Sequence, residues 1–365
     1  MAYKVNQMKD IFVNLGTDSY HIVIDRDILN RVGPHISKII NPGKAVVVTD
    51  KTVESLYGKA VFDSLSECNF DVKLVSIEPG EEQKTLSRAE ELYEVLFDHK
   101  VDRKSSIIAL GGGVIGDLTG FVASTFMRGI PFVQIPTTLL AQVDSSIGGK
   151  VAVNHPRGKN MIGCFYQPKA VFIDTATLQT LPKAEIIAGM VEVMKYGMIK
   201  DSAFFEYIEK HLSEILELDD VALEKVIHDS CMIKAQIVEL DEKEEGVRAI
   251  LNYGHTIGHA LESLTLYKKY RHGEAVAMGM IYATRIAMEM NLADDTVLKR
   301  QESLLKKLGL SLKDNELNPN DIVRVLYQDK KTIGGKLRFV LPTRIGDVAI
   351  TDEATDEVIL KVLSN

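Results

Sequence analysis

The sequence of 365 residues contains no tryptophan and only three cysteines, Cys68, Cys164 and Cys231. The cysteines are far apart and none belongs to a C-x-x-C pair, which argues against a disulfide framework and against a thiolate zinc site. No uncharged apolar stretch is long enough to span a bilayer, and the N-terminal MAYKVNQMKD is too polar for a signal peptide. We therefore expect a soluble protein in the cytoplasm, with no membrane partner.

Basic residues are in the minority, because 43 lysines and arginines face 51 aspartates and glutamates and give a formal net charge of -8. No basic block is present that could neutralise a polyanion, so nucleic acid is not an expected partner. Apolar residues, in contrast, are abundant and make up 45% of the chain. At a usual size of about 150 residues per domain, the chain is expected to hold two domains.

The first half of the sequence alternates short β-rich runs with helical ones. Strands are predicted at residues 45–49, 72–77, 107–110, 132–135 and 171–173. An earlier pair of runs, at residues 11–15 and 20–24, is expected to form an antiparallel hairpin. The alternation is typical of βαβ units and predicts a Rossmann-like, mainly parallel sheet. Ligands of such sheets bind beyond the carboxyl ends of the strands, so the loops found there are candidate binding sites.

From about residue 182 the sequence is helical, with leucine and methionine at three- and four-residue spacing. Helices are predicted at residues 184–199, 203–217, 221–240, 252–265, 273–290 and 295–308. Two β-like runs, at residues 337–341 and 347–350, are compatible with a small hairpin on the surface. We predict an α/β domain over residues 1–180, followed by an all-α domain over residues 181–365.

The run Gly111–Asp117, with the sequence GGGVIGD, follows a predicted strand and opens a predicted helix. It satisfies the pattern G-x-G-x-x-G, in which a tight turn and the free N–H groups of a helix N-terminus favour a pyrophosphate. The run follows the third strand rather than the first, and no acidic residue ends the next strand, so it departs from the usual dinucleotide fingerprint. A glycine turn that only packs a helix on a strand is the alternative.

Polar residues follow several other predicted strands. Asp50 closes the first strand of the alternating series, and Glu81 and Lys84 lie in the loop after the second. Thr137 and Thr138 follow the strand at residues 132–135. Each of these loops alone could be a solvated turn. Because they share one edge of one sheet, together they favour a dinucleotide.

Lysines stand beside glycines at residues 144–150, with the sequence DSSIGGK, and at residues 158–160, with the sequence GKN. This composition allows backbone and ammonium groups to surround a phosphate. Solvated surface lysines are the alternative for both segments.

Three histidines and one isolated acid stand out in the helical half. His255 and His259 share one helical face, away from the apolar stripe, and His272 opens a later helix. Glu192 and Lys195 are isolated charges in an apolar helix, where an unpaired charge is costly. The two could form an i,i+3 salt bridge with each other. Alternatively, Glu192 could join two of the histidines in a zinc site, and the spacing does not choose which two.

Over nearly its whole length the sequence resembles the 3-dehydroquinate synthase family of sugar-phosphate cyclases. The most specific stretches are GGGVIGDLTGFVASTFMRG from residue 111, QIPTTLLAQVDSSIGGKVAVNHPRGKNMIGCFYQP from 134, EVMKYG from 192, LNYGHTIGHALE from 251 and RHGEAVAMGM from 271. A related cyclase such as 2-deoxy-scyllo-inosose synthase, or a dehydrogenase such as glycerol-1-phosphate dehydrogenase, would share the two-domain design. The segments VDSSIGGKVAVN and GKNMIG favour the dehydroquinate branch.

The resemblance implies an NAD⁺-binding first domain, a metal- and substrate-binding helical second domain, and a homodimer. The implied metal is zinc, with cobalt as a possible substitute, and its implied ligands are Glu192, His255 and His272. The implied NAD⁺ contacts are Asp50, Glu81, Lys84, Gly113, Val114, Ile115, Gly116, Asp117, Thr137, Thr138, Lys150, Lys159, Thr177 and Thr180. The implied substrate contacts are Arg128 from the neighbouring subunit, Asp144, Asn160, Lys234, Arg248, Asn252 and one of Lys330 and Lys331. The implied catalytic residues are Lys150, Lys195, Glu244 and His259.

The implied reaction converts 3-deoxy-D-arabino-heptulosonate 7-phosphate to 3-dehydroquinate and phosphate, in the shikimate pathway of aromatic amino acid biosynthesis. It proceeds by oxidation, phosphate elimination, reduction, ring opening and intramolecular aldol closure. A protein that only senses NAD⁺ or metal is disfavoured, because each of the implied catalytic positions holds a chemically competent residue.

Overall fold

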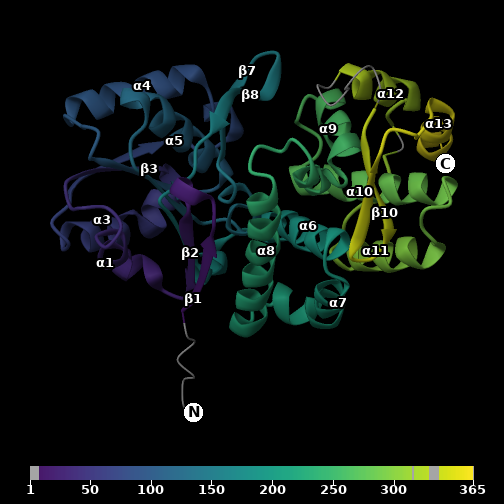
Figure 1. The fold of residues 1–365 in the computed structure, drawn as a ribbon, viewed down its shortest axis with the longest axis horizontal. Coiled ribbons are helices and arrows are strands. Elements are labelled where there is room, and N and C mark those ends of the chain that lie inside the picture. The colour runs from purple at the N-terminus through teal and green to yellow at the C-terminus, as the bar shows by residue number, and fades with distance from the viewer. Residues whose placement is uncertain (1–7, 315, 329–336, 365) are drawn as a thin grey trace, which may run out of the picture. The chain divides into compact units, whose positions relative to one another are not determined.

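The computed structural model describes residues 8–314, 316–328 and 337–364, and the chain separates into two compact units (Figure 1). The first unit is Met1–Pro182 with Leu218–Lys243, and the second is Lys183–Glu217 with Glu244–Asn365. The chain therefore passes between the units three times, where the sequence predicted a single boundary at residue 180. The first passage, after Pro182, lies close to that boundary, whereas residues 218–243 were expected in the second domain and belong to the first unit.

The first unit is built on a seven-stranded sheet with the strand order β1-β2-β9-β6-β5-β3-β4. Its strands are β1 Lys9–Val13, β2 Tyr20–Asp25, β3 Lys44–Asp50, β4 Asp71–Ile77, β5 Ser106–Gly111, β6 Phe132–Pro136 and β9 Ala170–Asp174. All neighbouring pairs are parallel except the β1–β2 hairpin. The predicted α/β architecture, its five parallel strands and the hairpin are confirmed.

The central strands are apolar throughout because helices cover both faces of the sheet. In β5, Ile107 and Ala109 join one buried cluster with residues of α4 and α5, while Ile108 and Leu110 join another with residues of α1 and α3. Figure 1 shows the α4–α5 pair and the α1–α3 pair on opposite sides of β3. The helices of this unit are α1 Val32–Ile36, α2 Lys51–Val53, α3 Lys59–Ser66, α4 Leu86–Asp98, α5 Gly113–Thr125 and α8 Asp220–Leu240.

The strand order explains where the glycine turn lies. β3 pairs with β4 on one side and with β5 on the other, so the direction in which successive strands are added reverses between β3 and β5. In open α/β sheets, ligands bind at the carboxyl ends of the two strands that flank such a reversal. These ends are Asp50 on β3 and Gly111 on β5. The glycine turn follows the third predicted strand, and in this topology that position lies at the edge where a ligand is expected to bind.

A second hairpin was not predicted, because the glycines and lysines of its sequence were interpreted as loops. It consists of β7 Lys150–His155 and β8 Gly158–Phe165, which pair in antiparallel fashion. Val151 and Val153 of β7 are buried in the cluster that includes α4 and α5. The hairpin thus places residues 150–160 next to the helix that follows the glycine turn.

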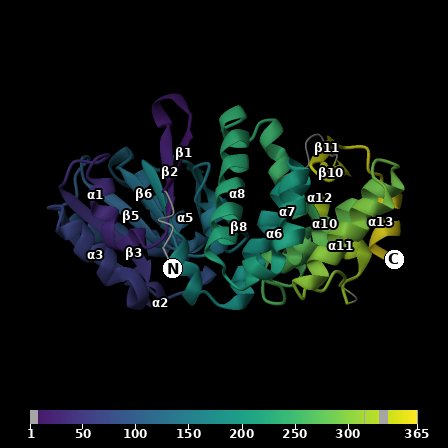
Figure 2. The same cartoon turned by 90° about the horizontal axis from the view of Figure 1, so that it is seen from below.

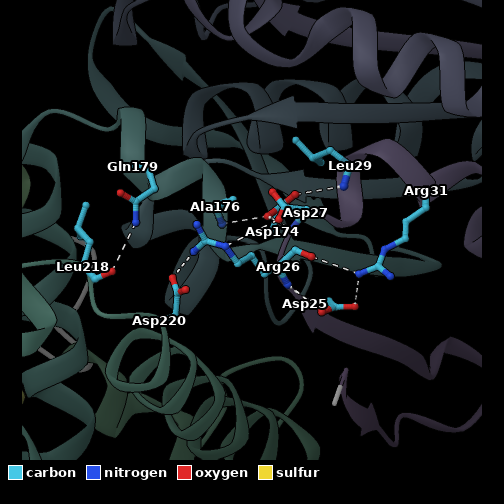
Figure 3. A network of polar contacts seen from close by, with 10 residues as sticks. All are labelled: Asp25, Arg26, Asp27, Leu29, Arg31, Asp174, Ala176, Gln179, Leu218 and Asp220. Carbon is cyan, nitrogen blue, oxygen red and sulfur yellow. Dashed lines mark hydrogen bonds and ion pairs between the residues drawn. The ribbon is translucent and has the colours of Figure 1, made fainter. Parts of the chain in front are cut away.

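Helix α8 belongs to the first unit because it packs against strands and turns of that unit. It packs on β1, β2 and the turn Ala141–Ser145. At its start, Arg26 donates to Asp220, and Gln179 Nε2 donates to the carbonyl oxygen of Leu218 at 3.4 Å, as Figure 3 shows. An amphipathic pattern identifies a helix but not the surface that covers its apolar face.

The second unit is mainly helical (Figure 2). Its helices are α6 Lys183–Ile199, α7 Ser202–Leu216, α9 His255–Leu264, α10 His272–Glu289, α11 Asp295–Lys307, α12 Pro319–Gln328 and α13 Asp356–Ser364. The six predicted helices are confirmed, with α8 in the first unit, whereas α12 and α13 were not predicted. The helix predicted from residue 252 begins only at His255, because Gly254 has a φ of 79°.

The second unit also contains a hairpin, β10 Phe339–Arg344 with β11 Asp347–Thr351, so it is not purely α-helical. The prediction of a hairpin on the surface was wrong for β10, whose Phe339, Val340 and Leu341 are buried and which packs on α10. Among the described residues, no helix combines the length and the apolar character that a bilayer crossing requires.

Candidate active site

The glycine turn presents an uncapped helix N-terminus. Gly112 is the N-cap of α5 and makes no side-chain capping hydrogen bond. The turn is also closely packed, since a methyl group added at Gly112 would lie 3.1 Å from the Thr138 side chain, and one added at Gly113 would lie 3.0 Å from Ser145 Oγ. Free N–H groups at the positive end of a helix suit an anion, and the small residues leave the backbone accessible to it.

Four of the implied site residues meet in one polar network beside this turn. Lys84 is 4% exposed, and its Nζ lies 2.5 Å from both Asp117 Oδ2 and Asn160 Oδ1. Asn154 links the two ends of the network, because its Oδ1 accepts from the Asn160 N–H at 2.9 Å and its Nδ2 donates to Glu81 at 2.7 Å. Burial raises the pKa of the Asp117 carboxyl, and the charge of Lys84 opposes that rise. No sequence signal marks Asn154, because only the folded hairpin brings it to Lys84.

The neighbouring strand ends are tied to the same edge of the sheet. The Thr137 N–H donates to the carbonyl oxygen of Gly111 at 3.0 Å, which joins the loop after β6 to the glycine turn. Asp50 caps α2, since its Oδ1 accepts from the N–H groups of Thr52 and Val53. One carboxylate oxygen of Asp50 therefore maintains the turn.

Thr177 and Thr180, two further implied NAD⁺ contacts, lie in the turn after β9. Thr177 is buried, donates to the carbonyl oxygen of Asp174 at 2.8 Å and accepts from Gln142 Nε2 at 3.0 Å. Thr180 Oγ1 lies 2.5 Å from the Tyr57 hydroxyl. Both threonines thus hold this turn in place through their own hydroxyl groups.

The other implied residues of the first unit are not all in one place. Lys234 of α8 is buried, and its Nζ donates to the carbonyl oxygen of Asp144 at 2.6 Å and to its Oδ1 at 2.8 Å. Lys150 is exposed at the start of β7, and Lys159 is half-buried on β8. Arg128 is exposed in a turn where its φ is 67°, a left-handed conformation that is uncommon for a residue with a side chain.

In the second unit, the isolated acid Glu192 meets both partners that the sequence offered. It is 0% exposed, and its Oε2 forms an ion pair with Lys195 Nζ. Its Oε1 lies 3.5 Å from His255 Nε2 and 3.7 Å from His272 Nε2. Among the described residues, neither oxygen accepts a hydrogen bond of normal geometry. A buried carboxylate needs a positive partner. Because Lys195 lies at Oε2 and the two histidines lie at Oε1, the salt bridge and a metal site can use the same carboxylate.

The structure distinguishes between the three histidines. Glu192, His255 and His272 each offer a ligand atom, and these atoms all lie within 4.8 Å of one another. The His259 ring centroid is 5.4 Å from that of His255 and 6.1 Å from that of His272, and its ligand atom groups instead with Glu262 and His272. One carboxylate and two imidazoles form a donor set typical of zinc.

Small residues bring the two ligating helices together. A methyl group added at Gly279 of α10 would lie 1.9 Å from the carbonyl oxygen of Gly254, and one added at Gly258 of α9 would lie 3.1 Å from that of Ala275. Glycine at these positions allows α9 and α10 to approach closely. Their first residues, His255 and His272, consequently have ring centroids 5.3 Å apart.

The orientation of His255 depends on residues that the sequence analysis missed. His255 Nδ1 donates to the carbonyl oxygen of Tyr253 at 3.1 Å, which directs Nε2 toward Glu192. The buried Tyr253 hydroxyl in turn lies 2.9 Å from Thr284 Oγ1 and accepts from Gln301 Nε2 at 2.7 Å. A buried tyrosine and glutamine at helical spacing resemble ordinary core residues, so no sequence signal marks them.

The remaining implied residues of this unit lie before α9. Asn252 Nδ2 donates to Glu244 Oε1 at 2.6 Å, and Arg248 between them is 1% exposed. Their segment, Val247–Asn252, packs on α6, the helix that carries Glu192. Lys330 and Lys331 lie outside the described residues.

Two family models match consecutive parts of the chain. Models of the 3-dehydroquinate synthase N-terminal and C-terminal regions match residues 74–188 and 189–332. A 3-dehydroquinate synthase of Desulforamulus reducens is 54% identical over 358 residues, covering 98% of this chain and 100% of the relative. One of Prochlorococcus marinus subsp. pastoris is 46% identical over 355 residues, covering 96% and 98%.

Two solved cyclase structures share the fold. The 2-epi-5-epi-valiolone synthase of Streptomyces hygroscopicus subsp. jinggangensis, with NAD⁺ and Zn²⁺ bound, is 26% identical with a TM-score of 0.88, covering 99% of this chain and 98% of its own. A 2-deoxy-scyllo-inosose synthase in complex with carbaglucose-6-phosphate, NAD⁺ and Co²⁺ is 29% identical with a TM-score of 0.87, covering 98% and 99%. Identity is far higher to the curated relatives, and it extends over their full length, so the chain belongs to the 3-dehydroquinate synthase family.

Proposed function

We propose that this enzyme carries out the reaction of its family, the conversion of 3-deoxy-D-arabino-heptulosonate 7-phosphate to 3-dehydroquinate and phosphate, with the residues described above. The observation that carries the proposal is the buried Glu192 carboxylate, which has an imidazole nitrogen of His255 and of His272 within 3.7 Å of one oxygen. The high identity to curated 3-dehydroquinate synthases supports it.

The first unit is proposed to bind NAD⁺ at the carboxyl ends of β3 and β5. The N-terminus of α5 has no side-chain cap and suits the pyrophosphate, and Gly112 and Gly113 present their backbone without a side chain. Lys84, fixed by Asp117 and Asn160, adds a cation that is already desolvated. When bound, NAD⁺ supplies a hydride acceptor at carbon 5 of the substrate and later returns the hydride. The two cyclase structures that contain NAD⁺ support this assignment.

Glu192, His255 and His272 are proposed to hold a divalent metal, with zinc as the first choice and cobalt as a substitute. Glu192 Oε1 lies near the Nε2 atoms of His255 and His272, while Oε2 pairs with Lys195, and one ligand atom from each of the three residues lies within 4.8 Å of the others. When bound, the ion supplies a Lewis acid that lowers the pKa of substrate hydroxyl groups. The Zn²⁺ and Co²⁺ of the two related structures support the choice of metals.

The polar residues around these groups are proposed to bind the sugar phosphate and hold its geometry. Lys195 is 1% exposed and lies against Glu192, so its ammonium group is positioned beside the metal ligands. Asn252 Nδ2 donates to Glu244 Oε1 at 2.6 Å, which holds the Glu244 carboxylate in place for a role in the active-site network. His259 is half-buried and is proposed to contact the substrate and exchange a proton with it. Correct positioning of a reacting group accounts for several kcal/mol of a barrier.

The proposed cyclase is distinguished from an ordinary dehydrogenase by its redox balance. Purified enzyme with NAD⁺, zinc and the heptulosonate phosphate should release phosphate and 3-dehydroquinate in equal amounts, while the absorbance of NADH does not accumulate. A substrate deuterated at carbon 5 should retain its label in the product. Release of NADH in proportion to substrate consumed would show that the enzyme is a dehydrogenase instead.

A homodimer with shared sites and a cytoplasmic location both remain predictions. Arg128 is exposed in a left-handed turn, which suits a side chain that reaches a neighbouring subunit. Mixing the inactive variants Arg128→Ala and Lys195→Ala should restore part of the activity, because some hybrid dimers would contain one intact site. If the mixed proteins exchange subunits and stay inactive, Arg128 does not complete a site in the partner.

A further inference from the structure

One buried carboxylate beside the candidate metal ligands has no role in the reaction described so far. Glu262 of α9 is 4% exposed, and its Oε2 lies 3.5 Å from His272 Nδ1. The other ring nitrogen of His272, Nε2, lies 3.7 Å from Glu192 Oε1. His272 therefore has a carboxylate at each of its two nitrogens.

Glu262 lies at the ring nitrogen that would carry the proton when His272 binds a metal through Nε2. A neutral imidazole has one N–H donor and one lone pair. A metal ion at Nε2 would use the lone pair of that nitrogen, which leaves the proton on Nδ1, where Glu262 Oε2 lies 3.5 Å away as an acceptor. Metal-ligating histidines commonly donate their second ring nitrogen in this way, which fixes the ring and raises its basicity as a ligand.

His272 needs such support more than His255 does. The side chain of His272 is 34% exposed, whereas that of His255 is 11% exposed and donates to the Tyr253 carbonyl oxygen at 3.1 Å. Packing therefore restrains the His255 ring, and the backbone fixes its proton. For the more exposed ring of His272, the carboxylate of Glu262 provides the corresponding restraint.

The charges of the cluster point the same way. The ion pair of Glu192 with Lys195 balances the negative charge of the ligating carboxylate. Neutral histidines add no charge, so a divalent cation would enter a set whose net charge is zero. Glu262 supplies a second buried negative charge next to that set, and buried charges require compensation.

We propose that Glu262 is a positioning residue for the metal centre, which holds His272 in the ligating tautomer and offsets the charge of the ion. The inference rests on the proposed metal site and extends it to a residue that does not touch the ion. A competing arrangement uses the same atoms, because His259, Glu262 and His272 could themselves hold a second ion. His272 Nδ1 cannot donate a proton to Glu262 and ligate an ion at the same time, so the two arrangements exclude each other.

The test measures zinc affinity by competition with a chromophoric chelator, in the wild type and in Glu262→Gln, Glu262→Ala and Glu302→Gln. We expect one zinc per chain in the wild type and an affinity about 10- to 100-fold lower in E262A. E262Q should lie between the two, because its amide oxygen still accepts a hydrogen bond but carries no charge. Glu302 of α11 is the matched control, since it pairs with Arg285 at 3.2 Å and E302Q should bind zinc like the wild type.

A second measurement separates positioning from general loss of structure. In the Co²⁺-substituted protein, the visible absorption bands should shift in E262Q and not in E302Q, because the bands report ligand geometry. Thermal unfolding of the metal-free variants shows whether E262Q or E262A folds poorly. If one of them does, Glu262→Asp, which keeps the charge on a shorter side chain, is measured in its place. It should bind zinc more tightly than E262A.

Two results would overturn the proposal. The first is unchanged zinc affinity and cobalt spectrum in well-folded E262Q and E262A. The second is a second zinc per wild-type chain that disappears in E262Q and in His259→Ala, which would make Glu262 a ligand. If the wild type binds no zinc, or if Glu192→Ala binds zinc as tightly as the wild type, the proposed metal site itself is rejected.

Discussion

Replacement of Tyr253 by phenylalanine should destabilise the second unit through a buried hydrogen-bond ring. Gln301 Nε2 donates to the Tyr253 hydroxyl at 2.7 Å, and that hydroxyl lies 2.9 Å from Thr284 Oγ1, which donates to Gln301 Oε1 at 2.7 Å. All three side chains are buried. Y253F leaves the shape of the ring nearly unchanged but removes the acceptor of a buried amide, which costs about 1–3 kcal/mol.

A double-mutant cycle separates this effect from a loss of packing. Gln301→Leu alone should cost about 1 kcal/mol, because the hydroxyls of Tyr253 and Thr284 still have each other and the carbonyl oxygen of Met280 as partners. In the double variant the amide of Gln301 is gone, so no buried amide lacks an acceptor. The free energy of unfolding lost in the double variant should therefore be about 1–2 kcal/mol smaller than the sum of the losses in the two single variants. Urea unfolding monitored by circular dichroism gives all four free energies.

The same tyrosine predicts a pH dependence. Burial raises the pKa of Tyr253 from 10.0 to about 12, although hydrogen bonds with Thr284 and Gln301 oppose the rise. A group whose pKa is higher in the folded state contributes stability below its unfolded pKa and loses it as the pH rises through the folded value. The advantage of the wild type over Y253F should therefore decrease by roughly 2–3 kcal/mol between pH 10 and pH 12. Additive free energies in the cycle, together with a constant difference across this pH range, would refute the reasoning.

Two further outcomes follow from the candidate site. His255→Ala or His272→Ala should remove bound zinc, measured by metal analysis after gel filtration, whereas His259→Ala should retain zinc and lose activity; full zinc occupancy in the first two variants would contradict the ligand assignment. Lys84→Met should cost about 3–5 kcal/mol at pH 7, because it leaves the largely buried Asp117 without its cation. Burial already raises the pKa of Asp117, so this cost should be smaller in unfolding experiments at pH 5, where more of the carboxyl is protonated; an equal cost at both pH values would argue against a charged Asp117.

The sequence by itself determined most of the helices and strands and the class of the fold. Apolar runs with turn residues between them gave the parallel strands, and three- and four-residue spacing gave the six long helices, because these periods reflect which side of a single element is buried. The glycine turn was also evident, since its spacing follows from local backbone geometry. Family resemblance supplied the residue roles, because patterns of this length are specific even where each motif alone is ambiguous.

Only the tertiary structure decided which elements share a core and which side chains meet. The pattern of α8 identified a helix but not its place beside β1 and β2, and the pairing of β7 with β8 was hidden because glycines and lysines interrupt its alternation. Spacing left three histidines equivalent, whereas the close contact of α9 and α10 at Gly279 brings His255 and His272 to Glu192. The physical reason is that local periodicity records only whether a side chain is buried, while its partners depend on how distant segments pack.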